Sequence, residues 1–258
     1  MSNLLDFTEN GIRNGKYDLV QCKKALSPSK LPGIDHALNT YGGCEHGCLY
    51  CYAPELTYTE WDDWKKIRVK MGIESRLGKE LAAIKGSVGI GTSTDPYQPA
   101  EGLFELTRKC LIKIKEKGIR IHLHTKSDLI LRDIPILSGM EGDVAVTITS
   151  VDESVSKTIE PGAPCPERRI KALKELTEAG INTYALAGPV LSVLDGREEE
   201  FTDAIISTGT KRMYIDALNE RPLLTQRMAS AGIRGSEKAR EKIRSYAMSA
   251  GIKVFDVF

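Results

Sequence analysis

The sequence predicts an α/β fold in which a parallel sheet with helical crossovers forms a partial (β/α)6 barrel of the TIM type. Six short apolar or β-branched segments are typical of strands, and segments with a helical spacing of apolar residues lie among them. Strands that alternate with helices at intervals of about one βαβ unit indicate parallel pairing. About six units are fewer than the eight of a closed barrel, and an open parallel sheet fits the same count.

Most of the predicted strands alternate in hydropathy or are apolar throughout, as strands covered by helices are. In such a sheet, the loops at the carboxyl ends of the strands hold the functional site. The strands are expected near 36–41, 88–92, 119–124, 144–149, 183–187 and 213–215, with 253–258 as a candidate for a last short strand.

The clearest predicted helix covers 101–117, where apolar residues recur at helical spacing until Gly118 ends the segment. A second covers 166–179, with a proline in its first turn and a glycine after its end. Two further helices are expected at 198–207 and 236–250.

Composition excludes several classes of protein. The chain has 258 residues, 41% of them hydrophobic, which is enough apolar material for a core and excludes a mainly disordered chain. Its 36 basic and 35 acidic residues give a net charge of +1, so bulk charge neither favours nor excludes a nucleic-acid partner. No apolar run is long enough for a membrane helix, and Asp6 and Glu9 interrupt the region where a signal peptide would begin. We therefore expect a cytoplasmic protein with no membrane partner.

No internal repeat, low-complexity segment or clear linker divides the sequence. We expect a single domain over 1–258. It would consist of an N-terminal segment at 1–34, a barrel core at 35–220, and a C-terminal helix and short strand at 221–258.

Three of the six cysteines lie within eight residues: Cys44, Cys48 and Cys51 form a CxxxCxxC pattern directly after the first predicted strand. Such tight clustering, in a chain without an export signal, indicates metal ligation rather than a disulfide framework. Three thiolates on one loop can hold three irons of a cubic [4Fe–4S] cluster and leave the fourth iron open for chemistry.

Two other interpretations of this group stay open. Zinc could take the same thiolates together with His46, although structural zinc sites usually join two separated pairs of ligands. The three cysteines could also be buried structural residues. Of the remaining cysteines, Cys110 is expected in the core and Cys165, at a helix start, is a candidate redox partner, whereas Cys22 has no assigned role.

The CxxxCxxC pattern, with Tyr50 before its third cysteine and a position after the first strand of a βα array, resembles the radical S-adenosylmethionine (SAM) superfamily. Further stretches resemble its spore photoproduct lyase-like branch, and together they cover most of the chain in order. They are LPGIDHALNTYGGCEHGCLYCYA (31–53), TSTDPYQPAE (92–101), TKSDLILRDIPIL (125–137) and EPGAPCPERRIKALKELTEAG (160–180).

The resemblance implies that the three cysteines ligate a [4Fe–4S] cluster whose open iron binds SAM. One electron, from a donor of flavodoxin or ferredoxin type, then cleaves SAM to a 5′-deoxyadenosyl radical that takes hydrogen from the substrate. Tyr50 is expected to pack near the adenine.

Polar side chains at the strand ends match the cofactor contacts of the family. Ser93 and Thr94 lie at the carboxyl end of the second predicted strand, directly after residue 92, and Thr94 matches a cofactor-contacting serine. Lys126, after the third strand, matches a lysine that pairs with the carboxylate of the cofactor. Thr147 and Thr149 share one face of the fourth strand, which could point toward the ribose and carboxylate. Each of these residues also has an ordinary structural interpretation. Ser93 and Thr94 could belong to a turn, and Lys126 could be a solvated surface group. Thr147 and Thr149 could reflect only the β-propensity of threonine.

The match departs from the lyase at one position. The lyase uses a cysteine as hydrogen donor where this chain has Thr92, and a hydroxyl is a far poorer donor of a hydrogen atom than a thiol. Photoproduct repair by the lyase route is therefore not expected. The tyrosine after the third cysteine is present as Tyr52. The candidate catalytic residues are Tyr52, Thr92 and Asp95, and the substrate is expected beside them at the barrel mouth, with Tyr97 and Gln98 close by.

We therefore predict a radical SAM enzyme of lyase or transferase type that abstracts hydrogen from an unidentified substrate. Nucleic acid is the first candidate by family analogy, and a peptide or small metabolite is the second. The alternative is a non-catalytic iron–sulfur or zinc module for electron transfer or sensing, which would need neither Thr94 nor Lys126.

Two other groups have open interpretations. Trp61 and Trp64, among four basic residues, indicate either a substrate entrance or an edge strand protected by lysines. His122 and His124 alternate on the third strand, and we expect them to be buried and hydrogen-bonded rather than metal ligands.

Overall fold

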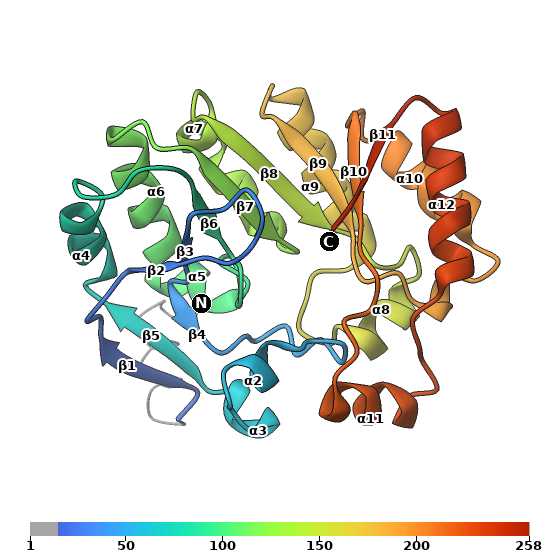
Figure 1. Ribbon diagram of the computed structural model, residues 1–258, viewed down its shortest axis with the longest axis horizontal. Helices are drawn as coiled ribbons and strands as arrows, with labels where there is room; N and C mark the ends of the chain where they lie inside the picture. Colours follow the sequence, from blue (N-terminus) through green and yellow to red (C-terminus); the bar gives the residue numbers. More distant parts are fainter. Residues whose placement is uncertain (1–14, 258) are drawn as a thin grey trace, which may run out of the picture.

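The computed structural model of the protein describes residues 15–257, which form two sheets flanked by helices (Figure 1). In the larger sheet, β2 is antiparallel to β3 and every other neighbouring pair is parallel. Its eight strands lie in the order β11 (Lys253–Asp256), β10 (Arg212–Ile215), β9 (Thr183–Ala187), β8 (Gly142–Thr147), β7 (Ile121–Thr125), β6 (Val88–Ile90), β3 (His36–Leu38) and β2 (Leu26–Pro28).

The larger sheet curves into a partial barrel with helices on its outer side (Figure 1). In β7, the buried Leu123 alternates with His122 and His124, which line a cavity inside the curve. The period of two thus turns apolar side chains toward the helices and polar ones inward. The predicted α/β partial barrel is confirmed. The covering helices are α6 (Leu106–Glu116), α9 (Pro166–Glu178), α10 (Glu198–Ile206) and α12 (Glu237–Ser249).

The smaller sheet has the order β1 (Tyr17–Gln21), β5 (Ile67–Met71), β4 (Tyr41–Gly42), so β5 is its central strand. The interpretation of the tryptophan-containing segment as an edge strand is therefore wrong. The sequence pattern could not reveal this, because β1 and β4 reach β5 from distant parts of the chain.

The first predicted strand, 36–41, is two strands in different sheets. The chain leaves the barrel after β3 because the side chain of Asn39 bonds to the 92–94 segment and the hydroxyl of Thr40 pairs with that of Thr107 at 2.9 Å. The other predicted strands lie at β6 to β11, each with boundaries that differ by no more than a few residues. Of the predicted segments, residues 1–14 and Phe258 lie outside the described residues.

The predicted helix 101–117 is broken into α5 (Pro99–Phe104) and α6. Glu105 lies between them in the left-handed region, with φ +52°. The buried carboxylate of Glu101 accepts the N–H groups of Thr107 and Arg108, at 2.8 and 3.0 Å, and so caps the first turn of α6. An internal cap of this kind is not visible in the apolar spacing.

The remaining helices are short, and no described helix is long and apolar enough to cross a membrane. The C-terminal segment contains one helix more than the predicted helix and strand. These elements are α2 (Ala53–Leu56), α3 (Trp61–Trp64), α4 (Ile73–Glu80), η1 (Asp128–Asp133), α7 (Ile134–Leu137), α8 (Glu153–Ile159), η2 (Ser192–Leu194) and α11 (Pro222–Ser230).

Candidate functional site

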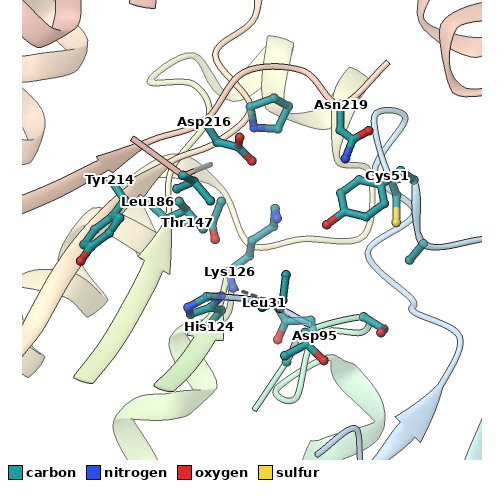
Figure 2. Close-up of a pocket in the computed structure, with 18 of the residues that line it drawn as sticks. Leu31, Cys51, Asp95, His124, Lys126, Thr147, Leu186, Tyr214, Asp216 and Asn219 are labelled. Carbon is teal, nitrogen blue, oxygen red and sulfur yellow. Dashed lines mark hydrogen bonds between the residues drawn. The ribbon is translucent and has the colours of Figure 1, made fainter. Parts of the chain in front are cut away.

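A cavity of about 580 Å³ lies inside the barrel at the carboxyl ends of the strands (Figure 2). It is lined by the loop that carries the cysteines and by the ends of β6 to β10, as expected for a parallel α/β sheet. Predicted site residues that line it are Cys44, Cys48, Tyr50, Cys51, Tyr52, Thr92, Ser93, Thr94, Asp95, Lys126 and Thr147. Thr149 is not among the lining residues; its buried hydroxyl has no hydrogen-bond partner within the described part of the chain.

The cysteine loop (43–52) follows β4 and is fixed by contacts from distant segments. Gly43 has φ +82°, and a Cβ there would lie 2.5 Å from the carbonyl oxygen of Trp64. The side-chain amide of the buried Gln98 donates to the carbonyl of Gly43 at 3.2 Å and accepts the N–H of Glu45 at 2.9 Å. The loop therefore has its conformation set before any ligand binds.

The donor set of this loop fits an iron–sulfur cluster. Cys44, Cys48 and Cys51 are all free thiols, and all three line the cavity. Burial raises the pKa of each thiol. Each thiol therefore stays protonated at neutral pH unless a metal displaces the proton.

The side chain of His46, the fourth ligand in the zinc interpretation, lies beside Asp95. Among residues 15–257, no group of three or more His, Cys, Asp or Glu side chains is arranged to hold a single metal ion. The Nδ1 atom of His46 lies 3.4 Å from a carboxylate oxygen of Asp95. Zinc needs its ligands within about 2.3 Å of one centre, whereas the thiolates of a cubic cluster each bind a different iron.

Asp95 joins the ends of β6 and β7. Its carboxylate accepts the hydroxyl of Thr125 and the backbone N–H of Lys126, both at 2.7 Å, and the N–H of Tyr97 at 2.9 Å. The carboxylate is therefore committed to contacts within the protein. Asp95 can thus hold the start of the segment after β7 in place while it lines the cavity.

The 92–94 segment is held by Asn39, a residue that the sequence analysis did not single out. The side-chain carbonyl of Asn39 accepts the N–H of Ser93 at 3.0 Å, and its NH2 group donates to the hydroxyl of Thr92 at 3.0 Å. Thr94 donates to the carbonyl of Tyr41 at 3.5 Å. These bonds orient the hydroxyls of Thr92 and Thr94 at the edge of the cavity and fix the backbone of Ser93 between them.

Lys126 projects into the cavity (Figure 2). Its ammonium lies 5.5 Å from the centre of the Tyr50 ring, and it has no hydrogen-bond or ion-pair partner within residues 15–257. Tyr50 donates to the buried carboxylate of Glu160, which also pairs with Arg169 at 2.5 Å. Burial raises the pKa of Glu160, and Arg169 opposes that shift. This buried chain fixes the ring beneath the ammonium.

The far side of the cavity carries a second charged group that sequence reasoning missed. Asp216, directly after β10, points into the cavity (Figure 2). Burial raises the pKa of Asp216 to about 6. Tyr52 lines the same side, with the guanidinium of Arg221 5.8 Å from its ring centre. The only sequence signal for Asp216 was its place at the end of a predicted strand.

Aromatic rings continue from the cavity toward the edge of the sheet. Tyr184 on β9 contacts Tyr214 on β10, and Tyr214 stacks on Phe255 of β11, with ring centres 4.6 and 4.9 Å apart. Arg212 lies 5.4 Å from the centre of the Tyr184 ring. Tyr184 is buried, whereas Phe255 is exposed. The rings thus lie in contact from the exposed Phe255 to the buried Tyr184.

The two histidines of β7 are hydrogen-bonded, as expected, but they are partly rather than fully buried and both line the cavity. His124 shares a hydrogen bond of 2.6 Å with the hydroxyl of Tyr184, and His122 shares one of 2.9 Å with Asp143. Burial lowers the pKa of His124 to about 4, so it is neutral at pH 7. Cys110 is buried in the core, as expected, while Cys22 and Cys165 do not line the cavity.

Known proteins share both the sequence and the fold. A family model described as the radical SAM superfamily matches residues 38–201. The uncharacterized protein MJ0683 of Methanocaldococcus jannaschii is 35% identical over 185 residues, which cover 69% of this chain and 70% of that protein. The uncharacterized protein Rv2578c of Mycobacterium tuberculosis is 30% identical over 192 residues, 68% of this chain, and the match spans 56% of its length.

Two solved structures have a similar fold. Spore photoproduct lyase complexed with dinucleoside spore photoproduct gives a TM-score of 0.72 at 15% identity, covering 100% of this chain and 85% of that one. Streptococcus suis SuiB bound to S-adenosylmethionine gives a TM-score of 0.61 at 18% identity, covering 85% and 49%. The chain thus has the fold of spore photoproduct lyase and, by the match to most of its barrel, belongs to the radical SAM superfamily, whose cofactors are a [4Fe–4S] cluster and SAM.

Proposed function

We propose that this radical SAM enzyme abstracts a hydrogen atom from a substrate bound at the mouth of the barrel. The observation that carries the proposal is that three free thiols line one cavity together with the ammonium of Lys126, which has no hydrogen-bond or ion-pair partner among residues 15–257. Cys44, Cys48 and Cys51 would each hold one iron of the cluster. When bound, the cluster and SAM supply a 5′-deoxyadenosyl radical.

The SAM site would lie between the cysteine loop and the ends of β6 to β8. Lys126 would pair with the carboxylate of SAM, since an unpaired cation in a cavity favours an anionic group. Ser93, Thr94 and Thr147 would offer hydroxyls to its polar groups, and Tyr50 would pack near the adenine. Thr149 does not line the cavity and is not included in this site.

The substrate would bind on the side of Tyr52 and Thr92. Asp95 would be a positioning residue, because its carboxylate accepts the backbone N–H of Lys126 and so orients that residue. Since Thr92 is a poor hydrogen-atom donor, we propose a lyase- or transferase-type reaction other than photoproduct repair by the lyase route.

For the substrate we propose a nucleic acid. The rings of Tyr184, Tyr214 and Phe255 support this, because bases stack on aromatic side chains without regard to sequence. Arg212 beside them adds a positive charge suited to phosphate. A peptide substrate is the other outcome. Anaerobic binding of a short single-stranded oligonucleotide, with wild type and Tyr214→Ala, separates the two: only a nucleic-acid site loses affinity for the oligonucleotide in the variant.

Radical SAM enzymes need a reductant, and we propose a flavodoxin- or ferredoxin-type donor. We also propose a reducing compartment such as the cytoplasm, because all six cysteines are free thiols.

The decisive test is anaerobic. The chain is reconstituted with iron and sulfide, dithionite and SAM are added, and 5′-deoxyadenosine is measured by mass spectrometry. Wild type should form it, and Cys48→Ala should not. Cys22→Ala, which changes a thiol that has no assigned role and lies away from the cavity, should behave as wild type.

The non-catalytic module makes the opposite prediction. It would hold a cluster but show no saturable binding of SAM. An intact cluster spectrum without SAM binding would therefore refute the enzyme proposal.

A further inference from the structure

The segment after β10 returns to the cysteine loop and forms α11 beside α2 and α3 (Figure 1). The N–H of Leu224, in the first turn of α11, donates to a carboxylate oxygen of Glu55 in α2 at 2.7 Å. α11 lies outside residues 38–201, which match the superfamily model. Its contact with the loop is therefore a feature that membership of the superfamily does not describe.

Arg227 makes the main contact between α11 and the loop. Its Nη2 donates to the carbonyl oxygen of Cys51 at 2.7 Å, and its Nε donates to that of Leu49 at 3.3 Å. The guanidinium also lies 4.1 Å from the centre of the Trp61 ring. Three contacts thus hold a permanent positive charge against the turn that carries the third cysteine.

The position of this charge differs from that of Lys126. Lys126 faces the cavity, where a bound carboxylate would neutralise it. Arg227 is not among the residues that line the cavity and approaches the turn through its carbonyl oxygens. Its charge therefore stays beside Cys51 whether or not the cavity is filled.

We propose that Arg227 is a positioning residue that fixes the 49–51 turn and raises the reduction potential of the cluster. Reduction adds one negative charge, which a nearby cation stabilises in a partly buried site. Hydrogen bonds and charges around the ligands are known to tune such potentials. This inference rests on the proposed function only in requiring a cluster at the three cysteines.

The test compares Arg227→Met with Arg227→Lys in the anaerobically reconstituted full chain. At one ambient potential, Arg227→Met should show roughly a tenfold lower ratio of reduced to oxidised cluster, which corresponds to about 59 mV for one electron. Arg227→Lys keeps the charge and should lie closer to wild type. Lys174→Met, which removes an exposed charge on α9, is the control. Potentiometric titration followed by electron paramagnetic resonance gives the ratio.

A second variant keeps the inference testable if Arg227→Met binds no cluster. Glu55→Gln retains an oxygen for the N–H of Leu224 but removes a negative charge that acts on Arg227. The ratio of reduced to oxidised cluster should then rise. Unchanged potentials in Arg227→Met at full iron content, or in Glu55→Gln, would overturn the inference and leave the proposed function standing. A wild-type chain that binds no cluster would refute the proposed function instead.

Discussion

At the scale of single residues, Lys126 is prepared for an anionic ligand. Asp95 holds its backbone N–H, and Tyr50 lies beneath its ammonium, so the side chain is oriented although no carboxylate within residues 15–257 pairs with it. An oriented cation without a counter-charge loses part of its hydration and recovers that free energy when an anion binds.

We expect Lys126→Met to weaken SAM binding about ten- to a hundredfold, since a charge-assisted hydrogen bond contributes about 1.5–3 kcal/mol. Equilibrium binding to the reconstituted protein under anaerobic conditions measures the change. Lys126→Arg, which keeps the charge, should recover part of the affinity. Equal affinity of wild type and Lys126→Met would show that the ammonium does not meet the ligand.

Asp216 gives a prediction about pH. Burial raises its pKa from 3.8 to about 6 in the folded protein, with Arg240 opposing the shift and Tyr52 nearby. Because its pKa is raised, the folded protein binds the proton of Asp216 more tightly than the unfolded chain does. The stabilising contribution of the protonated carboxyl is therefore complete below pH 3.8 and is lost as pH rises through 6.

Asp216→Asn removes this penalty on the charged form. The variant should therefore be more stable than wild type at pH 8, by about 1–2 kcal/mol after allowance for partial exposure, and the difference should shrink by pH 5. Urea unfolding of the cluster-free protein at both pH values tests this. Asp62→Asn, at an exposed position on α3, should show no such trend. A pH-independent difference for Asp216→Asn would contradict the assignment.

At the scale of elements, the cysteine loop depends on a close backbone crossing. Gly162 lies in the segment after α8, its N–H donates to the carbonyl of His46 at 2.9 Å, and a Cβ there would lie 2.0 Å from the carbonyl oxygen of Glu45. No side chain can be added without moving one of the two segments.

Gly162→Ala should therefore displace the cysteine loop and lower the iron content of the reconstituted protein, with a loss of stability of about 1–3 kcal/mol. Iron analysis and urea unfolding measure the two effects. Gly102→Ala is the matched control, because a Cβ on that α5 residue would meet nothing nearer than 3.9 Å. Normal iron content in Gly162→Ala would show that the crossing does not set the loop.

The elements also show what local sequence can predict. Strands β6 to β10 and helices α9, α10 and α12 were predictable because each has its own periodicity and end signals. The break at Glu105 was not, since it depends on the buried Glu101 carboxylate that caps the next helix. Asn39 and Arg227 escaped for the same reason: their partners lie far along the chain, and no local pattern marks such pairs. Asp216 was marked only by its place at the end of a predicted strand.

At the scale of the whole molecule, the open barrel explains why one cavity can hold so many polar groups. A closed barrel fills its interior with side chains in layers. Here, the inner face of the curved sheet presents His122, Asp143 and Tyr184 to a cavity instead. The sequence indicated this openness through its small number of βα units, but the size and lining of the cavity followed only from the register of the strands.

The single-domain organisation stays a prediction, and the core suggests how to test it. Tyr17 and Ile67 of the small sheet belong to the same buried apolar cluster as Leu123 and Phe201 of the barrel. A continuous core favours cooperative unfolding of both sheets, whereas two separate cores would unfold independently.

Both tryptophans lie in α3, next to the small sheet, whereas the helices that dominate far-ultraviolet circular dichroism cover the barrel. Fluorescence and circular dichroism therefore report on different parts of the molecule. In urea, we expect their midpoints to coincide for the cluster-free chain, because the shared core couples the two parts. Trp61→Phe, which leaves only the buried Trp64, should give the same midpoint. An earlier fluorescence transition would mean that the cysteine-loop side unfolds by itself, and the single-domain prediction would then be wrong.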